Sequence, residues 1–345
     1  MAYRLKLGEP VPAGIRRIVR EEIESAVRQL SGGGEADLDE AIHEARKSMK
    51  KIRGVLRLMR PELGEIYRRE NAFFRGVGRT LAQFRDAGAM IETFDALREK
   101  YRGELGRGRL ASIRRGLIAR KQQAEKQGDV EKVLKRMAAA LRRRASGVEK
   151  WPLAADGFGA IAPGLQATFR RGQKALARAR KHPLPENYHE WRKRVKDHWY
   201  HVRLLEGVWD SGIEAYEKSL KDLETFLGED HNLLVLRGKI QAEPAFYGNE
   251  PDIALLMKLI GASQCELRGH ALAAGGRIYG GKAGHFTRHI ERLWNKPPGV
   301  AKKKTAARRR PSARGLNLSG PPVTGGSGNR GGDPNGSQAP KGASQ

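Results

Sequence analysis

The chain of 345 residues has little of what stabilises an exported or membrane-bound protein. Its only cysteine is Cys265, which excludes an intramolecular disulfide and is typical of a reducing compartment. No stretch approaches the roughly 20 consecutive apolar residues that a membrane-spanning helix needs, and the first residues lack the apolar segment of a secretion signal. We therefore expect a cytoplasmic protein that neither crosses nor enters a membrane.

Aromatic residues and common catalytic motifs are also scarce. Aromatic side chains make up only 6% of the sequence, which argues weakly against a protein that stacks nucleic-acid bases on aromatic rings. Neither a Walker loop nor a Ser-His-Asp or Cys-His arrangement is recognisable. The sequence therefore offers no familiar signature of an enzyme.

Alternating β-branched runs, which are typical of strands, are rare as well. Long stretches rich in Ala, Leu, Arg, Lys and Glu are separated by Gly and Pro, and this pattern predicts an all-α fold. The expected helices cover about 13–30, 37–60, 63–84, 87–101, 109–127, 130–146, 161–181, 186–206, 213–227, 230–242, 251–272 and 283–294.

Acidic residues are few in relation to basic ones. The 66 Lys and Arg residues outnumber 39 Asp and Glu residues, which gives a net charge of +27, so a polyanion is the expected partner. Residues 296–345 are rich in Gly, Pro and Ser and carry +9 of this charge, leaving +18 for the rest. We expect this segment to be a disordered basic tail, whose run "KKKTAARRR" could bind nucleic acid loosely.

One basic motif occurs twice. "HEARKSMK" begins at His43 and "HEWRKRVK" begins at His189, so His-Glu-x-Arg-Lys-x-x-Lys recurs 146 positions later. The segments "GIRRIVREEIESAV" and "GLQATFRRGQKALARAR", which precede the two motifs, are similar too. These correspondences predict an internal duplication, with repeats at about 12–146 and 158–294.

Each motif forms a basic stripe on a helical wheel, opposite an apolar face that includes Ile42, Met49 and Ile52 in the first copy. The two stripes contain His43, Arg46, Lys47, Lys50 and Arg57, and then His189, Arg192, Lys193, Lys196 and Arg203. Like charges one turn apart repel each other by a few tenths of a kcal/mol. A solvated basic face is one interpretation, but the repeated register favours a bound anion.

The two motif histidines suit either an anion or a metal ion. Arg and Lys neighbours repel a divalent cation and offer no lone pairs, whereas a protonated imidazole can donate to phosphate. We therefore predict that His43 and His189 donate to an anion, and that the protein needs no metal or other cofactor. His198 falls on the apolar side of its helix and is expected to pack in the core.

The two motif regions resemble a known family. The run "FRRGQKALARARKHPLPENYHEWRKRVKDHWYHVRLL" looks like the conserved histidine α-helical domain, or CHAD domain, and "AIHEARKSMKKIRGVLRLMRPELG" is similar to the first copy in that family. The resemblance spans about residues 8–294. It implies two pseudo-symmetric antiparallel four-helix bundles around a basic surface or pore that binds inorganic polyphosphate, often at polyphosphate granules.

The resemblance also implies which side chains contact phosphate. The residues that match by position are His43, Arg46, Lys47, Lys50, Arg57, His189, Arg192, Lys193, Lys196 and Arg203, supported by Arg17, Arg20, Arg171 and Lys174. The two copies differ at one position of the stripe, where Arg53 corresponds to Trp199.

Three classes of function remain open at this point. The leading hypothesis is a non-catalytic polyphosphate-binding protein. The first alternative is a metal-dependent phosphohydrolase acting on polyphosphate or nucleotides, which would need carboxylates such as the repeated Asp86 and Asp230. These two residues are expected to begin helices and to act as caps. The second alternative is a nucleic-acid-binding protein, and the sequence does not specify an oligomeric state.

Overall fold

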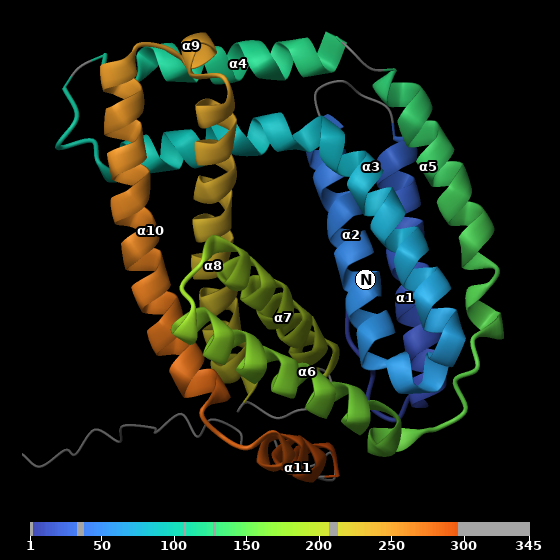
Figure 1. The fold of residues 1–345 in the computed structure, drawn as a ribbon. Helices are drawn as coiled ribbons and strands as arrows, with labels where there is room; N and C mark the ends of the chain where they lie inside the picture. The colour runs from blue at the N-terminus through green and yellow to red at the C-terminus, as the bar shows by residue number, and fades with distance from the viewer. Residues whose placement is uncertain (1–2, 33–37, 107, 127–128, 207–212, 296–345) are drawn as a thin grey trace, which may run out of the picture. The chain divides into compact units, whose positions relative to one another are not determined.

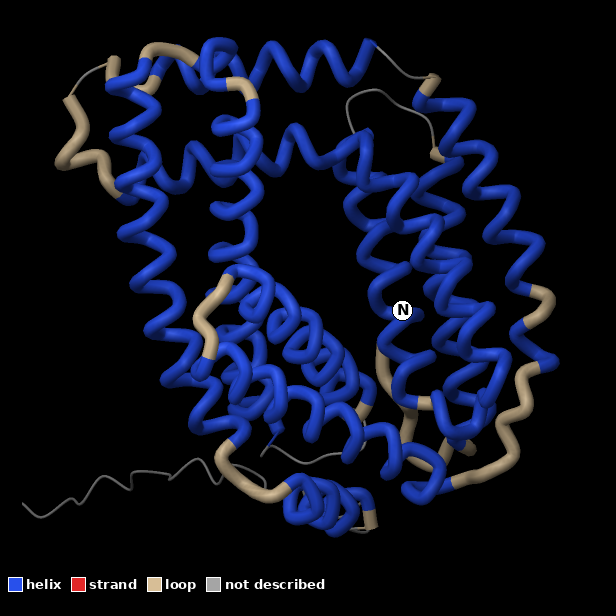
Figure 2. Tube along the Cα trace, viewed as in Figure 1, coloured by secondary structure: helices blue, strands red, loops and turns tan. Residues whose placement is uncertain are grey.

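The structure, a computed structural model, describes residues 3–32, 38–106, 108–126, 129–206 and 213–295. The tail that was predicted to be disordered, residues 296–345, lies outside the described residues. Every regular element in the described ranges is helical, which confirms the all-α prediction (Figures 1 and 2). The elements are α1 (Val11–Ser31), α2 (Leu38–Leu58), α3 (Arg60–Lys100), α4 (Ala111–Lys126), α5 (Val130–Ala145), the 3₁₀ turn η2 (Val148–Lys150), α6 (Gly157–Lys181), α7 (Pro185–Leu204), α8 (Ile213–Ala242), α9 (Pro244–Tyr247), α10 (Glu250–Tyr279) and α11 (Ala283–Trp294).

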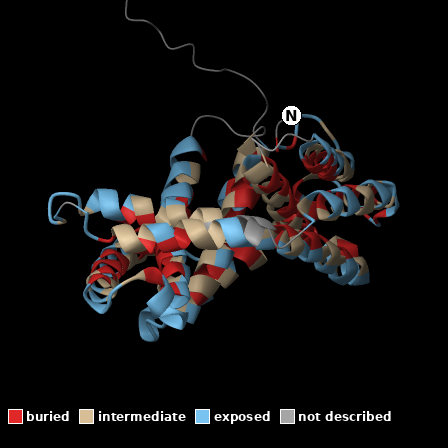
Figure 3. Cartoon of the chain, turned by 90° about the horizontal axis from the view of Figure 1, so that it is seen from above, coloured by how far each residue is buried: buried red, intermediate tan, exposed pale blue. Residues whose placement is uncertain are grey.

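The helices form because their apolar residues recur at the spacing of one helical face. In α2, Ile42, Met49 and Ile52 are almost fully buried, as the wheel predicts for the side opposite the basic stripe. Figure 3 shows the same division throughout the described residues, with buried positions on the sides of helices that face other helices. His198 is fully buried, as predicted.

Two apolar cores lie beside the two motif helices. The first core joins α1, α2, the first half of α3 and α5, and includes Ile18, Ile52 and Phe74. It also takes in the start of α6, the end of α7 and Ile290 of α11. The second joins α6, α7, the first half of α8 and the last part of α10, and includes Trp191 and Leu223. The apolar residues within the two motifs, such as Met49 on α2 and Trp191 on α7, therefore lie in different cores.

A third core joins the two halves of the chain. It contains Phe94 from α3 and Ile113 from α4, together with Leu236 from α8 and Leu256 from α10. This core exists because α3 and α8 are long helices that run past the first two cores. The predicted breaks between 84 and 87, and between 227 and 230, are therefore wrong.

The order of packing is similar in the two halves. Helices α1, α2 and α3 pack in sequence, as do α6, α7 and α8. The last part of each half differs, because the first has two helices, α4 and α5, whereas the second has the single long helix α10 followed by α11. The duplication itself stays a prediction.

No helix within the described ranges is long and apolar enough to cross a membrane.

The two halves approach each other closely where α6 meets the end of α2. A Cβ atom at Gly164 of α6 would overlap the carbonyl oxygen of Leu58 and lie 2.7 Å from its carbonyl carbon. Only a residue without a side chain fits here, because the obstacle is backbone that cannot rotate away. Gly164 is therefore a point at which the packing of the two halves can be tested.

We predict that Gly164→Ala lowers the free energy of unfolding by about 1–3 kcal/mol, because the added methyl group overpacks the contact with Leu58. Gly159→Ala on the same helix is the matched control, since a Cβ there would meet nothing within 4 Å. The control is expected to be neutral or to stabilise by up to about 1 kcal/mol through helix propensity. Equal unfolding midpoints in denaturant for the two variants would contradict the close approach.

Candidate anion-binding site

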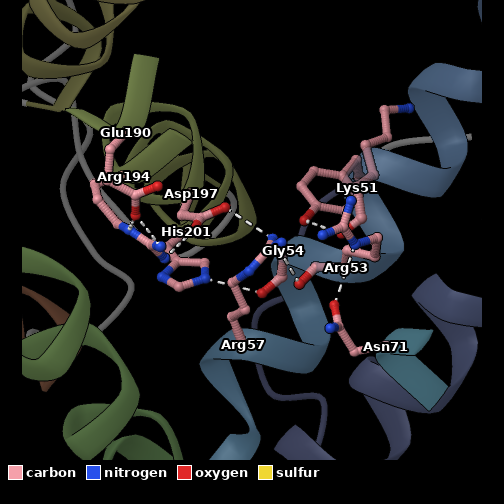
Figure 4. A network of polar contacts seen from close by, with 10 residues as sticks. Lys51, Arg53, Gly54, Arg57, Asn71, Glu190, Arg194, Asp197 and His201 are labelled. Atoms are coloured by element: carbon pink, nitrogen blue, oxygen red, sulfur yellow. Dashed lines mark hydrogen bonds and ion pairs between the residues drawn. The ribbon is translucent and has the colours of Figure 1, made fainter. Parts of the chain in front are cut away.

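The site is built around the crossing of α2 and α7 at Gly54. A Cβ atom at Gly54 would lie 3.1 Å from Cβ of Tyr200 and 3.2 Å from the hydroxyl oxygen of Tyr3. The Nε2–H of His201 donates to the Gly54 carbonyl oxygen at 2.9 Å (Figure 4). Burial lowers the pKa of His201 to about 3, so the ring is neutral. Gly54 and Tyr200 are 146 positions apart, and the crossing therefore brings equivalent positions of the two motifs into contact.

One to two turns before the crossing, four basic side chains form what we call the central cation cluster. Its members, two from each motif, are Arg46, Lys50, Arg192 and Lys196. Burial, followed by the repulsion of Lys196 and then of the two arginines, lowers the pKa of Lys50 to about 7. Lys50 forms no ion pair with any described residue. The structure thus brings together four of the predicted residues, and neither Lys50 nor Arg192 has a counter-ion among the described residues.

A buried carboxylate of α8 lies within this cluster. Glu224 of α8 accepts from Lys196 at 2.7 Å and from Lys221 at 3.0 Å, and its side chain is only 6% exposed. Burial raises the pKa of Glu224, but the two lysines outweigh this effect and lower the pKa to about 2. Glu224 therefore stays ionised and neutralises Lys196, the lysine that the second motif contributes to the cluster.

Buried polar atoms without partners lie at the histidine end of the second motif. The rings of His189 and His231 are 4.2 Å apart. Nδ1 of each ring and Nε of Arg192 have no hydrogen-bond partner among the described residues. Burial lowers the pKa of His189, and it lowers that of His231 to about 4. Unsatisfied buried polar groups of this kind carry a desolvation penalty that a ligand could remove.

The outer lysines of the motifs are held by the motif glutamates. Lys47 pairs with Glu44 at 2.9 Å, and Lys193 pairs with Glu190 at 2.8 Å. Both pairs sit on the flank of the stripe, where the helical wheel places the glutamates. His43 is half-buried at the start of its stripe. These positions extend each stripe beyond the central cation cluster.

Four of the predicted residues lie elsewhere. Arg17 is bound by Glu9 at 2.7 Å and Glu21 at 3.2 Å, and its hydrogen bond to Glu9 is the main reason that its pKa is raised. Arg20 pairs with Glu149 at 2.6 Å. The guanidinium group of Arg203 lies over the ring of Trp199 at 5.1 Å. Arg57 forms a buried ion pair with Asp197.

The pair of Arg57 and Asp197 connects the two motif helices just beyond Gly54. Nη1 of Arg57 lies 2.8 Å from Oδ1 of Asp197 (Figure 4). Arg194 approaches the other oxygen of Asp197 at 3.6 Å and also binds Glu190. Burial raises the pKa of Asp197 in spite of these arginines. The last two predicted residues, Arg171 and Lys174, line a cavity beside this ion pair.

Sequence reasoning missed Glu224 and His231, for one reason. Both lie on α8, which was predicted to break between 227 and 230, so their spacing was not read as one helical face. On a continuous helix, Glu224, Gly228 and His231 are at i, i+4 and i+7 and face the same side. Arg192 packs over Gly228, where a Cβ would lie 3.7 Å from its Nε.

The two aspartates considered as metal ligands do not begin helices. Asp230 lies inside α8, is buried, and accepts from Nε of Arg268 at 2.7 Å. The prediction that it caps a helix is therefore wrong. Asp86 lies inside α3, and its side chain is outside the described residues. In the part of the chain that the structure describes, no group of three or more His, Cys, Asp or Glu side chains is placed to hold a metal ion.

Comparisons with known proteins agree with the fold. The family model for the CHAD domain matches residues 17–241. Among solved structures, the crystal structure of the CHAD domain from the plant Ricinus communis is similar, with a TM-score of 0.53 and 17% sequence identity. The alignment covers 81% of this chain and 93% of that one. No curated protein matches the chain.

The equivalent lysines of the central cation cluster are predicted to affect stability in opposite directions. Lys50→Met should raise the free energy of unfolding at pH 6 by about 1 kcal/mol or more, because it removes a buried charge that is not paired. Lys196→Met should lower it by about 1–3 kcal/mol, because Glu224 then keeps only Lys221. Denaturant unfolding of both variants measures the difference, and equal shifts would mean that the two environments are alike.

The free energy of unfolding, measured in the same way, is also expected to depend on pH. A lysine whose pKa is near 7 in the folded state and about 10.4 in the unfolded state binds fewer protons in the folded state between these values. The stability contributed at Lys50 should therefore rise as the pH increases from about 7 to 10, and Lys50→Met should lack this rise.

Proposed function

The chain belongs to the CHAD domain family, and on that premise we propose that it binds inorganic polyphosphate at the central cation cluster. The observation that carries the proposal is the position of Lys50. This lysine is brought beside Lys196 and two arginines with no counter-ion of its own among the described residues. An anion bound there would relieve the repulsion and raise the pKa of Lys50.

Further contacts support an anion with several regularly spaced charges. Arg192 offers a buried Nε–H without a partner, and arginine suits phosphate oxygens because its donors form a planar fork. The motif histidines and outer lysines continue the basic stripes on α2 and α7. A linear polyphosphate could contact both stripes, whereas a single phosphate could satisfy only the centre.

We propose binding without catalysis. A Mg²⁺-dependent phosphohydrolase needs carboxylates that hold the metal ion beside the phosphates. In the central cation cluster the carboxylate of Glu224 is already bound to two lysines. Because one long polymer can hold many copies of the protein, such binding would also associate the protein with polyphosphate granules.

The test compares two double variants of the full chain. Lys50→Gln with Arg192→Gln removes two charges from the central cation cluster and should weaken binding of long-chain polyphosphate by about tenfold or more, since a hydrogen bond to a charged group is worth about 1.5–3 kcal/mol. Lys132→Gln with Lys135→Gln is the matched control, because both lysines lie on the exposed face of α5. The control should change the affinity by less than about threefold.

Titrations at physiological salt, with polyphosphate and duplex DNA at matched phosphate concentration, provide the measurement. Equal losses in the two double variants would indicate diffuse electrostatic attraction and would contradict the proposed site. Stronger binding of DNA than of polyphosphate would favour a nucleic-acid-binding function instead.

Binding is also predicted to depend on pH in the direction set by Lys50. In the free protein Lys50 loses its proton near pH 7, whereas a bound anion keeps it protonated to higher pH. Binding above pH 7 therefore takes up a proton, and the affinity for polyphosphate should fall between about pH 7 and 9. Lys50→Gln should bind more weakly but with a flatter profile over this range.

The His189→Gln variant tests whether the pH dependence of binding comes from Lys50 or from a motif histidine. Because burial lowers the pKa of His189 below its ordinary value, this imidazole is neutral in the free protein above pH 7. The His189→Gln variant should therefore keep the decline between pH 7 and 9. A profile that is flat in His189→Gln and steep in Lys50→Gln would assign the proton to the histidine.

A further inference from the structure

A cavity of about 590 Å³ lies beside the ion pair of Arg57 and Asp197, away from the lysines of the central cation cluster. Residues of α2, α3, α6 and α7 line it, and Tyr67 and Ala175 contribute part of its wall. Its volume is within the range of about 300–1,000 Å³ that is typical of small-molecule sites. The cations that line the cavity are Arg57, Arg60, Arg171, Lys174, Arg178 and Arg194.

Two of these cations are fixed in place by carboxylates. Arg57 is held by Asp197, and Arg194 is held by both Glu190 and Asp197 (Figure 4). Their guanidinium groups are therefore oriented before any ligand arrives, which lowers the entropy lost on binding.

The other four cations form no ion pair with a described residue. Arg60 lies over the ring of Tyr67 at 5.0 Å, and Arg171 is half-buried. Burial lowers the pKa of Arg171, with further lowering by Arg60 and Arg194. The cavity therefore collects positive charge that the protein itself does not neutralise.

The corresponding positions of the first motif region are neutralised. Arg17 and Arg20 match Arg171 and Lys174 in the aligned segments, and carboxylates bind both of them. Arg194 has Ser48 as its counterpart, which is uncharged. Three of the four free cations of the cavity, Arg171, Lys174 and Arg178, thus lie on α6, and Arg60 joins them from α3. Their collection in one cavity of this size indicates one discrete ligand instead of a polymer that follows both stripes.

We propose that this cavity is a second anion site, which binds a small molecule carrying a chain of three phosphates. Such a chain on an organic group carries about four negative charges near neutral pH, because each inner phosphate keeps one charge and the terminal phosphate, with a second pKa of about 6, keeps nearly two. This charge matches the four unpaired cations. The ligand is either a nucleoside triphosphate or inorganic tripolyphosphate, whose second terminal phosphate adds up to one further charge.

The test is calorimetric titration of the full chain with inorganic tripolyphosphate and, separately, with ATP. Arg60→Gln with Arg178→Gln removes two unpaired charges and should weaken the binding of tripolyphosphate by about tenfold or more. Both side chains are exposed, so the fold should tolerate the change. The matched control is Arg68→Gln with Arg136→Gln, two exposed arginines outside the cavity, which should change the affinity by less than about threefold.

The arms of the experiment separate the two ligand sources and the two sites. Tighter binding of ATP than of tripolyphosphate, reduced by Tyr67→Leu, would identify a nucleoside triphosphate, whereas tighter binding of tripolyphosphate would identify the inorganic chain. The proposal would be overturned if the Lys50 and Arg192 double variant lost tripolyphosphate binding while the Arg60 and Arg178 double variant kept it. The absence of measurable binding to the wild-type protein would also overturn it.

The result is independent of polyphosphate binding at the central cation cluster. If long-chain polyphosphate does not respond to Lys50 and Arg192, the proposed function fails, but a tenfold response of tripolyphosphate to Arg60 and Arg178 would still support the cavity. If only the cavity variants weaken the binding of long-chain polyphosphate and tripolyphosphate does not bind, the second site fails as a small-molecule site.

Discussion

The close contact of α2 and α7 at Gly54 is the constraint on which the rest of the structure depends. Because Gly54 has no side chain, the two helices approach until Tyr200 packs against the backbone. Lys50 and Lys196 each lie one turn before this contact, so the same approach forces two like charges together. The hydrogen bond from His201 to Gly54 and the buried pair of Arg57 and Asp197 hold the helices in place against that repulsion.

The neighbourhood of this contact is asymmetric although its two motifs are alike. Glu224 neutralises Lys196 but leaves Lys50 without a partner among the described side chains. On the other side of the ion pair, Arg171 and Lys174 form no ion pair with a described residue, whereas their counterparts Arg17 and Arg20 are bound by glutamates. Similar motifs therefore create different electrostatic environments, and the difference comes from carboxylates outside the motifs.

The sequence predicted the helical class, the basic face of each motif helix and the burial of His198, because these depend on local spacing. It did not predict Glu224 as the partner of Lys196, since the two residues are 28 positions apart and meet only through the packing of α7 against α8. It also missed the continuity of α3 and α8. Gly228 and Asp230 resemble a helix boundary locally, but burial and the bond from Arg268 stabilise a helical conformation there.

The third core has a consequence for how the chain folds during synthesis. It joins residues 90–117 to residues 233–260, so it cannot close until about 140 further residues have been added after the first segment. At 5–20 residues per second this takes roughly 7 to 30 seconds. During that time the apolar side chains of Phe94, Leu97 and Ile113 lack their final partners, whereas most of the first core can already pack. The nascent chain must therefore carry an exposed apolar surface on α3 and α4, which makes this surface the natural place for a chaperone to bind.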